Sequence, residues 1–234
     1  MDNVFKFKQF QIDQTGCAMK VNTDGVLLGA MVTHQAPLRI LDIGTGTGVI
    51  ALMLAQRFVN ALIDAVEIDE LAAETAQKNF QLSVFNKRLT IHHLAFQEFA
   101  GQQKYDLIVS NPPFFVNDLK NEEHRKGIAR HADVDFFEML LKKSAHLLSA
   151  NGKLWLILPV KQADEVVTKA HRFDLSLCKR VNLHSDKTKP TFRQIICLSK
   201  GNVPLIETDF YIYESLKQNT HEYRLLLKDF FLAF

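Results

Sequence analysis

The sequence predicts an α/β fold: a doubly wound, mostly parallel seven-stranded sheet with a C-terminal antiparallel hairpin. Short apolar runs alternate with stretches of helical spacing through the middle of the chain. The first of these runs ends in a glycine-rich turn, as strand-to-helix junctions of such sheets do. Two β-like runs then follow each other without a helix between them, which indicates an antiparallel pair.

The elements follow in chain order from these patterns. Residues 4–12 alternate partly and predict a short strand or hairpin, and Asp24 is placed to cap a helix through VLLGAMV. The predicted helices cover residues 49–58, 70–82, 136–148 and 163–171. The predicted strands cover residues 38–43, 62–68, 89–94, 106–110, 153–158, 175–183 and 194–199.

Length and composition are those of one globular domain. The chain has 234 residues, of which 47% are hydrophobic and 23% charged, so it can bury a sizeable core. We expect residues 1–234 to form a single domain, with residues 1–35 as an N-terminal strand and helix extension packed on it and residues 205–234 as a C-terminal extension. The net charge of +2 is too small to indicate a nucleic-acid partner by itself.

The cysteines and the N-terminus indicate a reducing compartment. Cys17, Cys178 and Cys197 are far apart and form no C-x-x-C pair, so neither a zinc site nor a disulfide framework is expected. The first residues lack the apolar core of a signal peptide, and no apolar run is long enough to span a bilayer. We therefore expect a cytoplasmic protein with no metal and no membrane partner; its oligomeric state is left open, with a monomer favoured.

The segment LDIGTGTG places three glycines between a predicted strand and a predicted helix. Glycine lets the backbone turn tightly and approach a ligand, although such junctions also use glycine for structural reasons alone. Glu67 ends the next strand, where a carboxylate can bind both ribose hydroxyls, and Asp42 in the turn suits a cation. The pattern resembles the class I, Rossmann-like methyltransferases that use S-adenosylmethionine (SAM). The resemblance implies cofactor contacts from Asp42, Gly44, Thr45, Gly46, Gly48, Glu67 and Ile68.

A second motif, Asn111-Pro112-Pro113-Phe114, follows a predicted strand that should lie beside the first one. An exocyclic amine is a poor nucleophile because its lone pair is delocalised. The side-chain oxygen of Asn111 and the carbonyl of Pro112 can accept hydrogen bonds from its two N–H groups, and Phe114 can stack on the ring that carries the amine. Two prolines stiffen the loop. The motif resembles the signature of methyltransferases acting on adenine N6, cytosine N4 or protein glutamine, with Phe where most have Tyr; a plain Pro-Pro turn is the alternative.

The two flanks of the chain indicate which class of substrate is methylated. FKFKQFQIDQTGCAMKVNTDGVLLGA and HEYRLLLKDFFLAF, together with NPPF, resemble the bacterial tRNA adenine-N6 methyltransferases that modify the adenosine beside the anticodon of a valine tRNA. The resemblance implies that Lys20, Thr23 and Asp24 border the methionine end of the cofactor and that residues 111–114 hold the adenine, with Asn111 also touching the cofactor. Ala95 stands where an acid is expected to bind the cofactor adenine, so that contact is assigned to the backbone near Phe96, or to Gln97 or Glu98.

Basic residues gather in two places late in the chain. Residues 178–193 hold five Lys or Arg against one Asp, and a predicted loop after NPPF is also basic. Such clusters suit RNA phosphates, although charge runs are often merely solvated. The predicted RNA contacts are Arg125, Lys126, Arg130, Lys187, Lys189 and Arg193.

Together these observations predict a SAM-dependent enzyme that methylates the exocyclic N6 of an adenosine in tRNA. Two alternatives stay open from the residues alone. One is a glutamine N5 methyltransferase acting on a translation protein, because an amide nitrogen poses the same electronic problem. The other is a non-catalytic RNA-binding module that keeps the fold.

Overall fold

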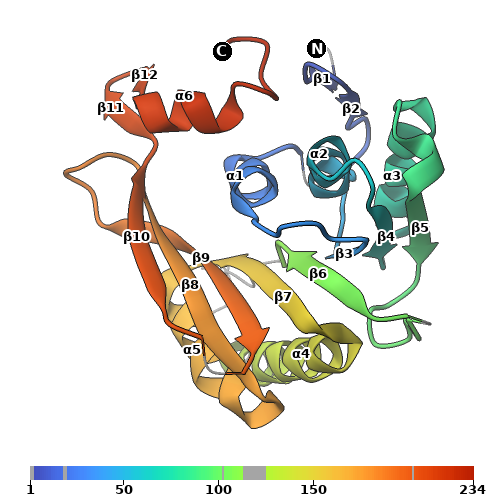
Figure 1. Ribbon diagram of the computed structural model, residues 1–234, viewed down its shortest axis with the longest axis vertical. Helices are drawn as coiled ribbons and strands as arrows, with labels where there is room; N and C mark the ends of the chain where they lie inside the picture. The colour runs from blue at the N-terminus through green and yellow to red at the C-terminus, as the bar shows by residue number, and fades with distance from the viewer. Residues whose placement is uncertain (1–2, 18–19, 102, 113–124, 202) are drawn as a thin grey trace.

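A computed structural model describes residues 3–17, 20–101, 103–112, 125–201 and 203–234, with the backbone alone described for residues 125–135. An eight-stranded sheet runs through its centre, in the order β10-β8-β9-β7-β6-β3-β4-β5 (Figure 1). In chain order its strands are β3 (Arg39–Ile43), β4 (Leu62–Glu67), β5 (Leu89–His93), β6 (Tyr105–Ser110), β7 (Leu148–Leu158), β8 (Leu175–His184), β9 (Thr191–Lys200) and β10 (Ile206–Tyr211).

The strand directions confirm the predicted fold class. Strands β5, β4, β3, β6 and β7 are parallel neighbours, and β9 is antiparallel to both β7 and β8. The eighth strand, β10, is parallel to β8 and was not predicted. It reads IETDFY at a sheet edge and is mostly exposed, so it carries no apolar run that would indicate a strand.

Helices cover both faces of the sheet (Figure 1). One face carries α1 (Thr23–Met31), α2 (Val49–Arg57) and α3 (Glu70–Leu82), and the other carries α4 (Arg125–Leu147) and α5 (Val160–Ala170). The short 3-10 helices are η1 (Asn86–Arg88) and η2 (His171–Phe173).

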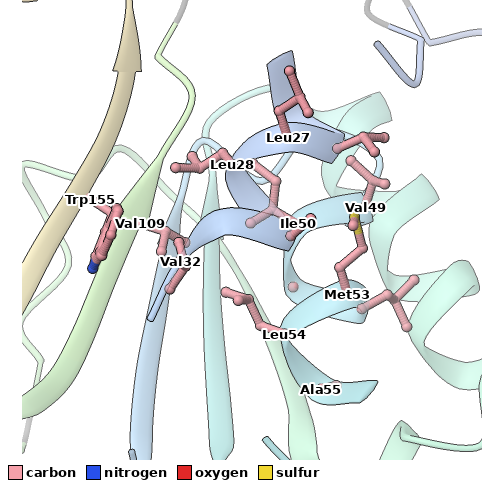
Figure 2. Packing of buried hydrophobic residues seen from close by; sticks show 14 of the residues in the cluster. Leu27, Leu28, Val32, Val49, Ile50, Met53, Leu54, Ala55, Val109 and Trp155 are labelled. Carbon is pink, nitrogen blue, oxygen red and sulfur yellow. The ribbon is translucent and has the colours of Figure 1, made fainter. Parts of the chain in front are cut away.

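The central strands are apolar at nearly every position because both of their faces are buried. In β6, Leu107 and Val109 belong to the cluster under α1 and α2, whereas Ile108 belongs to the cluster under α4 and α5. Figure 2 shows the first cluster, in which Leu28 of α1 lies over the sheet near Val109, and Trp155, the partner of Val109 on β7, lies beside it. This double burial explains why the apolar runs predicted β3, β4 and β6 to within one residue. Strand β7 begins at Leu148 rather than at residue 153, because its first residues include the polar segment 149–152 and show no apolar run.

Three helix starts differ from the prediction. Helix α5 begins at Val160 rather than at residue 163. Helix α4 begins at Arg125 rather than at residue 136, because its first turns are polar and show no apolar periodicity. Helix α1 is capped by Asn22, whose side chain accepts a hydrogen bond from the N–H of Gly25 at 2.9 Å. Asp24, predicted as the cap, lies in the first turn, since the extended backbone that a cap requires falls at Asn22.

The two ends of the chain lie together on one side of the molecule (Figure 1). The predicted N-terminal hairpin is present as β1 (Val4–Lys6) and β2 (Gln11–Asp13), and the chain ends with β11 (Tyr213–Ser215), β12 (Gln218–Asn219) and α6 (His221–Leu227). An isolated antiparallel bridge joins Phe7 to Phe231. The division into one domain with two extensions stays a prediction. Within the described ranges, no helix is long and apolar enough to cross a membrane.

Candidate active site

The glycine turn and Asn111 meet at one edge of the sheet. Strands β3 and β6 are neighbours, and Ile43 is paired with Ser110 at their carboxyl ends, so the residues that follow both strands emerge side by side. The Ser110 hydroxyl also donates to the Ile43 carbonyl at 2.7 Å. The predicted meeting of the two motifs is therefore present. A pocket between them is lined by Lys20, Asn22, Gly25, Gly44, Thr45, Gly46, Thr47, Val49, Ile50 and Asn111.

The backbone of the turn requires its glycines. Gly44, Gly46 and Gly48 have φ values of 69°, 58° and 86°, a left-handed region that other residues rarely adopt. A Cβ on Gly48 would lie 2.5 Å from Cε1 of Phe80, whereas a Cβ on Gly44 or Gly46 would meet no atom of the described residues within 4 Å. Gly48 thus allows close packing, while Gly44 and Gly46 leave the backbone open to a ligand.

Glu67 supports the turn directly. Its Oε2 accepts a hydrogen bond from the N–H of Gly46 at 2.9 Å, and its Oε1 accepts from the N–H groups of Ile68 at 2.8 Å and Asp69 at 3.0 Å. Only 9% of Glu67 is exposed, whereas 69% of Ile68 is. A carboxylate has about four lone-pair positions, so one acceptor position of Glu67 is left, which suffices for one of the two predicted ribose hydroxyls.

Asp42 lies beneath the turn and is fully buried. Its Oδ2 accepts from the Thr45 hydroxyl at 2.6 Å and from the Ala51 N–H at 3.1 Å, which ties the turn to the start of α2. Burial raises the pKa of this carboxyl to about 7, and nearby Glu67 adds to the rise. Oδ1 is buried and accepts from no group of the described chain. A nearby cation would favour the ionised carboxylate, but direct contact between Asp42 and a cofactor stays a prediction.

Asn111 forms a wall shared by two pockets. It lines the pocket at the glycine turn and a second cavity of about 440 Å³, which is within the range of small-molecule sites. Its Oδ1 is buried, and no donor in the described part of the chain reaches it. A buried acceptor of this kind is costly unless a ligand supplies the donor. Besides Asn111, the second cavity is lined by Asn22, Thr23, Asp24, Pro112, Phe192 and Arg193.

The other predicted catalytic residues are only partly accounted for. Pro112 is buried and lines the second cavity, as its predicted role beside a substrate requires. Pro113 and Phe114 lie outside the described residues, so the stacking role of Phe114 stays a prediction.

The N-terminal segment contributes to both pockets. Lys20 lines the pocket at the glycine turn, as predicted, whereas Thr23 and Asp24 line the second cavity. Asp24 accepts a hydrogen bond on Oδ2 from Nε of Arg193 at 2.9 Å, with both side chains largely buried. Arg193, predicted as a phosphate contact, therefore lies in the cavity wall and holds helix α1 against strand β9.

The turn after β5 holds the residues predicted to contact the adenine of the cofactor, and that contact stays a prediction. The side chain of Phe96 is only 6% exposed and packs in the core under α4, so it offers backbone rather than ring to a ligand. Gln97 and Glu98 are exposed, and the Gln97 carbonyl accepts from Lys143 Nζ at 2.6 Å.

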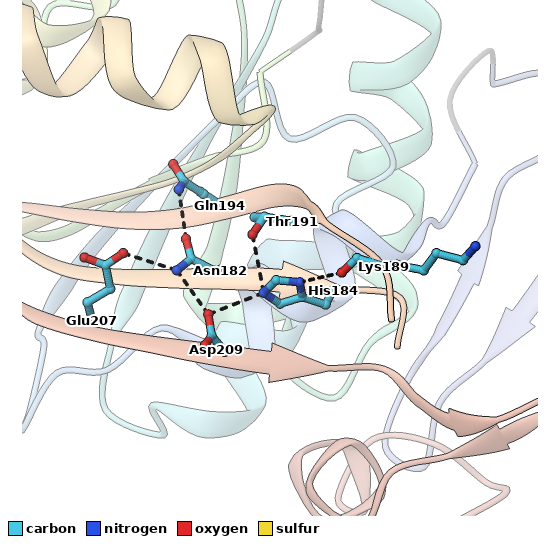
Figure 3. Close-up of polar contacts among 7 residues, drawn as sticks. All are labelled: Asn182, His184, Lys189, Thr191, Gln194, Glu207 and Asp209. Atoms are coloured by element: carbon cyan, nitrogen blue, oxygen red, sulfur yellow. Dashed lines mark hydrogen bonds and ion pairs between the residues drawn. The ribbon is translucent and has the colours of Figure 1, made fainter. Parts of the chain in front are cut away.

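The predicted basic hairpin lies at the same edge of the sheet. Strands β8 and β9 meet at the pair His184 and Thr191, and the turn between them carries Lys187 and Lys189, both exposed. His184 stabilises this end: Nδ1 bonds the Lys189 carbonyl at 3.0 Å, and Nε2 is 3.3 Å from both Asp209 and Thr191 (Figure 3).

The second basic group was predicted to lie in a loop, but it lies in the first turns of helix α4. These turns hold Arg125, Lys126 and Arg130, and the structure describes only their backbone. Their contact with RNA stays a prediction.

Sequence reasoning missed several pocket residues. Asn22 was recognisable as a capping residue before a helix, but capping alone does not indicate a ligand. Phe192 carried no signal, because nothing in its local sequence shows that β9 returns beside β7. Within the described ranges, no three His, Cys, Asp or Glu side chains gather as a metal site would require.

Fold and site together define a methyltransferase. The chain belongs to the methyltransferase small domain family, whose model matches residues 17–173. It is 57% identical to the tRNA1(Val) (adenine(37)-N6)-methyltransferase of Pedobacter heparinus, with 100% of both chains covered. It is 42% identical to the protein of that name from Dyadobacter fermentans, with 98% of each covered. The predicted family resemblance is thereby confirmed.

Solved structures agree on the fold. A predicted O-methyltransferase from Agrobacterium tumefaciens superposes with a TM-score of 0.71 at 17% identity, covering 88% of this chain and 96% of that chain. At this identity the likeness concerns the fold alone.

Proposed function

We propose that this enzyme transfers a methyl group from SAM to the exocyclic N6 of an adenosine in tRNA, beside the anticodon of a valine tRNA. The observation that carries the proposal is the position of Asn111. Its buried Oδ1 lacks a donor in the described chain, and the residue separates the glycine-turn pocket from a second cavity. An amine that enters the second cavity can donate a hydrogen bond to this oxygen while facing the first pocket.

The residues of the first pocket fit the cofactor. The open backbone at Gly44 and Gly46 can approach it closely, Glu67 retains an acceptor position for ribose, and Lys20 and Asn22 close another side. When bound, SAM supplies a methyl group activated by a positive sulfonium. The chain itself then has to position the two reactants and exclude water, which can supply much of the rate.

Asn111 has a more specific task. When its Oδ1 accepts a hydrogen bond from an N–H group of the target amine, the nitrogen lone pair is less delocalised into the ring and can point at the methyl group. The carbonyl of Pro112 is the proposed second acceptor. The ion pair of Asp24 and Arg193 holds part of the wall of the same cavity in place.

Two observations favour RNA adenine over protein glutamine. The full-length relatives at 57% and 42% identity carry the tRNA adenine-N6 name. The exposed Lys187 and Lys189 lie at the catalytic edge, where they suit a polyanion. No observation in the described site favours glutamine specifically.

The test uses methyl-labelled SAM with bulk tRNA and with translation proteins as acceptors. We expect label that RNase removes and protease does not, and nucleoside digestion should yield N6-methyladenosine by mass. Oligonucleotide mapping should place it beside the valine anticodon. Label removed by protease would instead identify the glutamine reaction. The absence of any transfer, with RNA still bound, would make the chain a binding module.

A further inference from the structure

One buried amide connects the glycine turn with the N-terminal hairpin. Asn79 of α3 is only 1% exposed. Its Nδ2 donates to the carbonyl of Thr47 at 2.9 Å and to that of Asp13 at 3.0 Å, and its Oδ1 accepts from the N–H of Asp13 at 2.9 Å. Both amide protons are used. The reversed amide would set its oxygen against two carbonyl oxygens, so the network determines its orientation.

The bond to Thr47 acts on the cofactor pocket directly. Thr47 lies between Gly46 and Gly48, both in left-handed conformations, and lines that pocket. Asp42 and Glu67 hold the turn from the ends of β3 and β4. Asn79 adds an anchor from α3 at Thr47, to which neither Asp42 nor Glu67 is hydrogen-bonded in the contacts described for them.

The bonds to Asp13 act on another wall of the same pocket. Asp13 ends strand β2, and the next residue, Gln14, accepts on Oε1 a hydrogen bond from the N–H of Val21 at 2.9 Å. Val21 stands between Lys20 and Asn22, and both of these line the pocket. The position of this wall therefore depends on where Asn79 holds the end of the hairpin.

We propose that Asn79 is a positioning residue for cofactor binding, which sets the glycine turn and the N-terminal segment at the spacing that SAM requires. It touches neither cofactor nor substrate and acts through Thr47 and Asp13. The inference rests on the proposed function only in taking SAM as the ligand of this pocket. Loss of the amide leaves the carbonyl of Thr47 and both backbone groups of Asp13 without this partner.

The experiment compares Asn79→Ala and Asn79→Asp with Ser83→Ala in the full chain. Asn79→Asp keeps the shape and the acceptor but replaces the donor with an oxygen that faces two carbonyls. Ser83 is a matched control at the end of α3: it is buried, it donates to the Phe80 carbonyl at 2.9 Å and accepts from the Phe85 N–H at 3.2 Å, and it does not line the pocket. Calorimetry gives the Kd for SAM, and thermal unfolding gives the stability of each variant.

We expect both Asn79 variants to bind SAM about tenfold more weakly, which corresponds to about 1.4 kcal/mol. Ser83→Ala should lower the melting temperature yet leave the Kd within about twofold. At saturating SAM the methyl-transfer rate of the Asn79 variants should recover to within about threefold of the wild type, since only cofactor binding is affected. Amide hydrogen exchange should rise in residues 44–48 and 3–13 of these variants.

A wild-type Kd in both Asn79 variants would overturn the inference, as would an equal loss of binding in Ser83→Ala. If the wild type binds SAM but does not methylate tRNA, the proposed function fails while the comparison of Asn79 with Ser83 still decides this inference. If the wild type binds no SAM, both are wrong.

Discussion

Asp42 shows how one buried carboxyl can organise a ligand-binding turn. It accepts two hydrogen bonds from the turn and from α2, yet full burial raises its pKa to about 7. The folded protein therefore keeps this group protonated at pH values where the unfolded chain, with a pKa near 3.8, has already released the proton. Stability from this group is complete at low pH and is lost as the pH rises toward and through the folded pKa.

The pH dependence of folding tests this account of Asp42. The Asp42→Asn variant cannot ionise but keeps an oxygen that accepts from Thr45 and Ala51. Between about pH 5 and about pH 8, the free energy of unfolding of the wild type should fall by about 1 kcal/mol or more beyond the fall in Asp42→Asn. Urea denaturation of both proteins at the two pH values measures this difference in the free energy of unfolding. Parallel pH dependence in the two proteins would contradict the buried, proton-holding carboxyl.

At the scale of elements, the β8–β9 hairpin brings positive charge to the catalytic edge. Its end is stabilised by the His184 contacts and by Asn182, whose amide lies 3.2 Å from both Glu207 and Asp209 of β10 (Figure 3). Strand β10, which was not predicted, thus supports the hairpin that carries the predicted RNA contacts.

Charge reversal in this hairpin should weaken RNA binding. The double variant Lys187→Glu/Lys189→Glu should bind tRNA about tenfold more weakly at low salt, and the dependence of log K on log salt should flatten by about one to two units. Cofactor affinity should not change. Lys78→Glu/Lys87→Glu alters net charge equally at exposed positions away from this hairpin, so it serves as the control. Equal weakening by the control pair would remove the hairpin from RNA recognition.

The elements differ in how far sequence could predict them, and burial explains the difference. Strands β3 and β6 are covered on both faces and were predicted almost to the residue, whereas exposed β10 and the polar start of α4 had no periodicity to detect. The meeting of the glycine turn with Asn111 followed from strand order. The pairing of Asp24 with Arg193, 169 residues apart in the chain, depends on how β9 returns and could not be predicted.

At the scale of the whole molecule, the two chain ends pack against each other. The rings of Phe5 and Phe7 each lie 5.8 Å from that of Phe231, and Lys8 N–H donates to the Phe230 carbonyl at 2.8 Å. The hairpin held in this way is the one that Asn79 joins to the glycine turn. Packing at the chain ends is therefore connected to the cofactor pocket through α3.

Phe231→Ala tests the packing of the two ends. Because it removes ring contacts from both terminal segments, it should lower the free energy of unfolding by about 2 kcal/mol and speed amide exchange in residues 3–13. Leu216→Ala, at a side chain that is 92% exposed, should change stability by no more than about 0.5 kcal/mol. Unchanged exchange in the hairpin would show that the C-terminal segment does not hold it.

The most direct measurement is the single-turnover rate of methyl transfer to tRNA by Asn111→Ala at saturating SAM and tRNA. Loss of the acceptor that orients the target amine should slow this step by about 10²- to 10³-fold, although both substrates are bound. A rate equal to that of the wild type would mean that the oxygen of Asn111 does not act on the amine, and the proposed mechanism would be wrong.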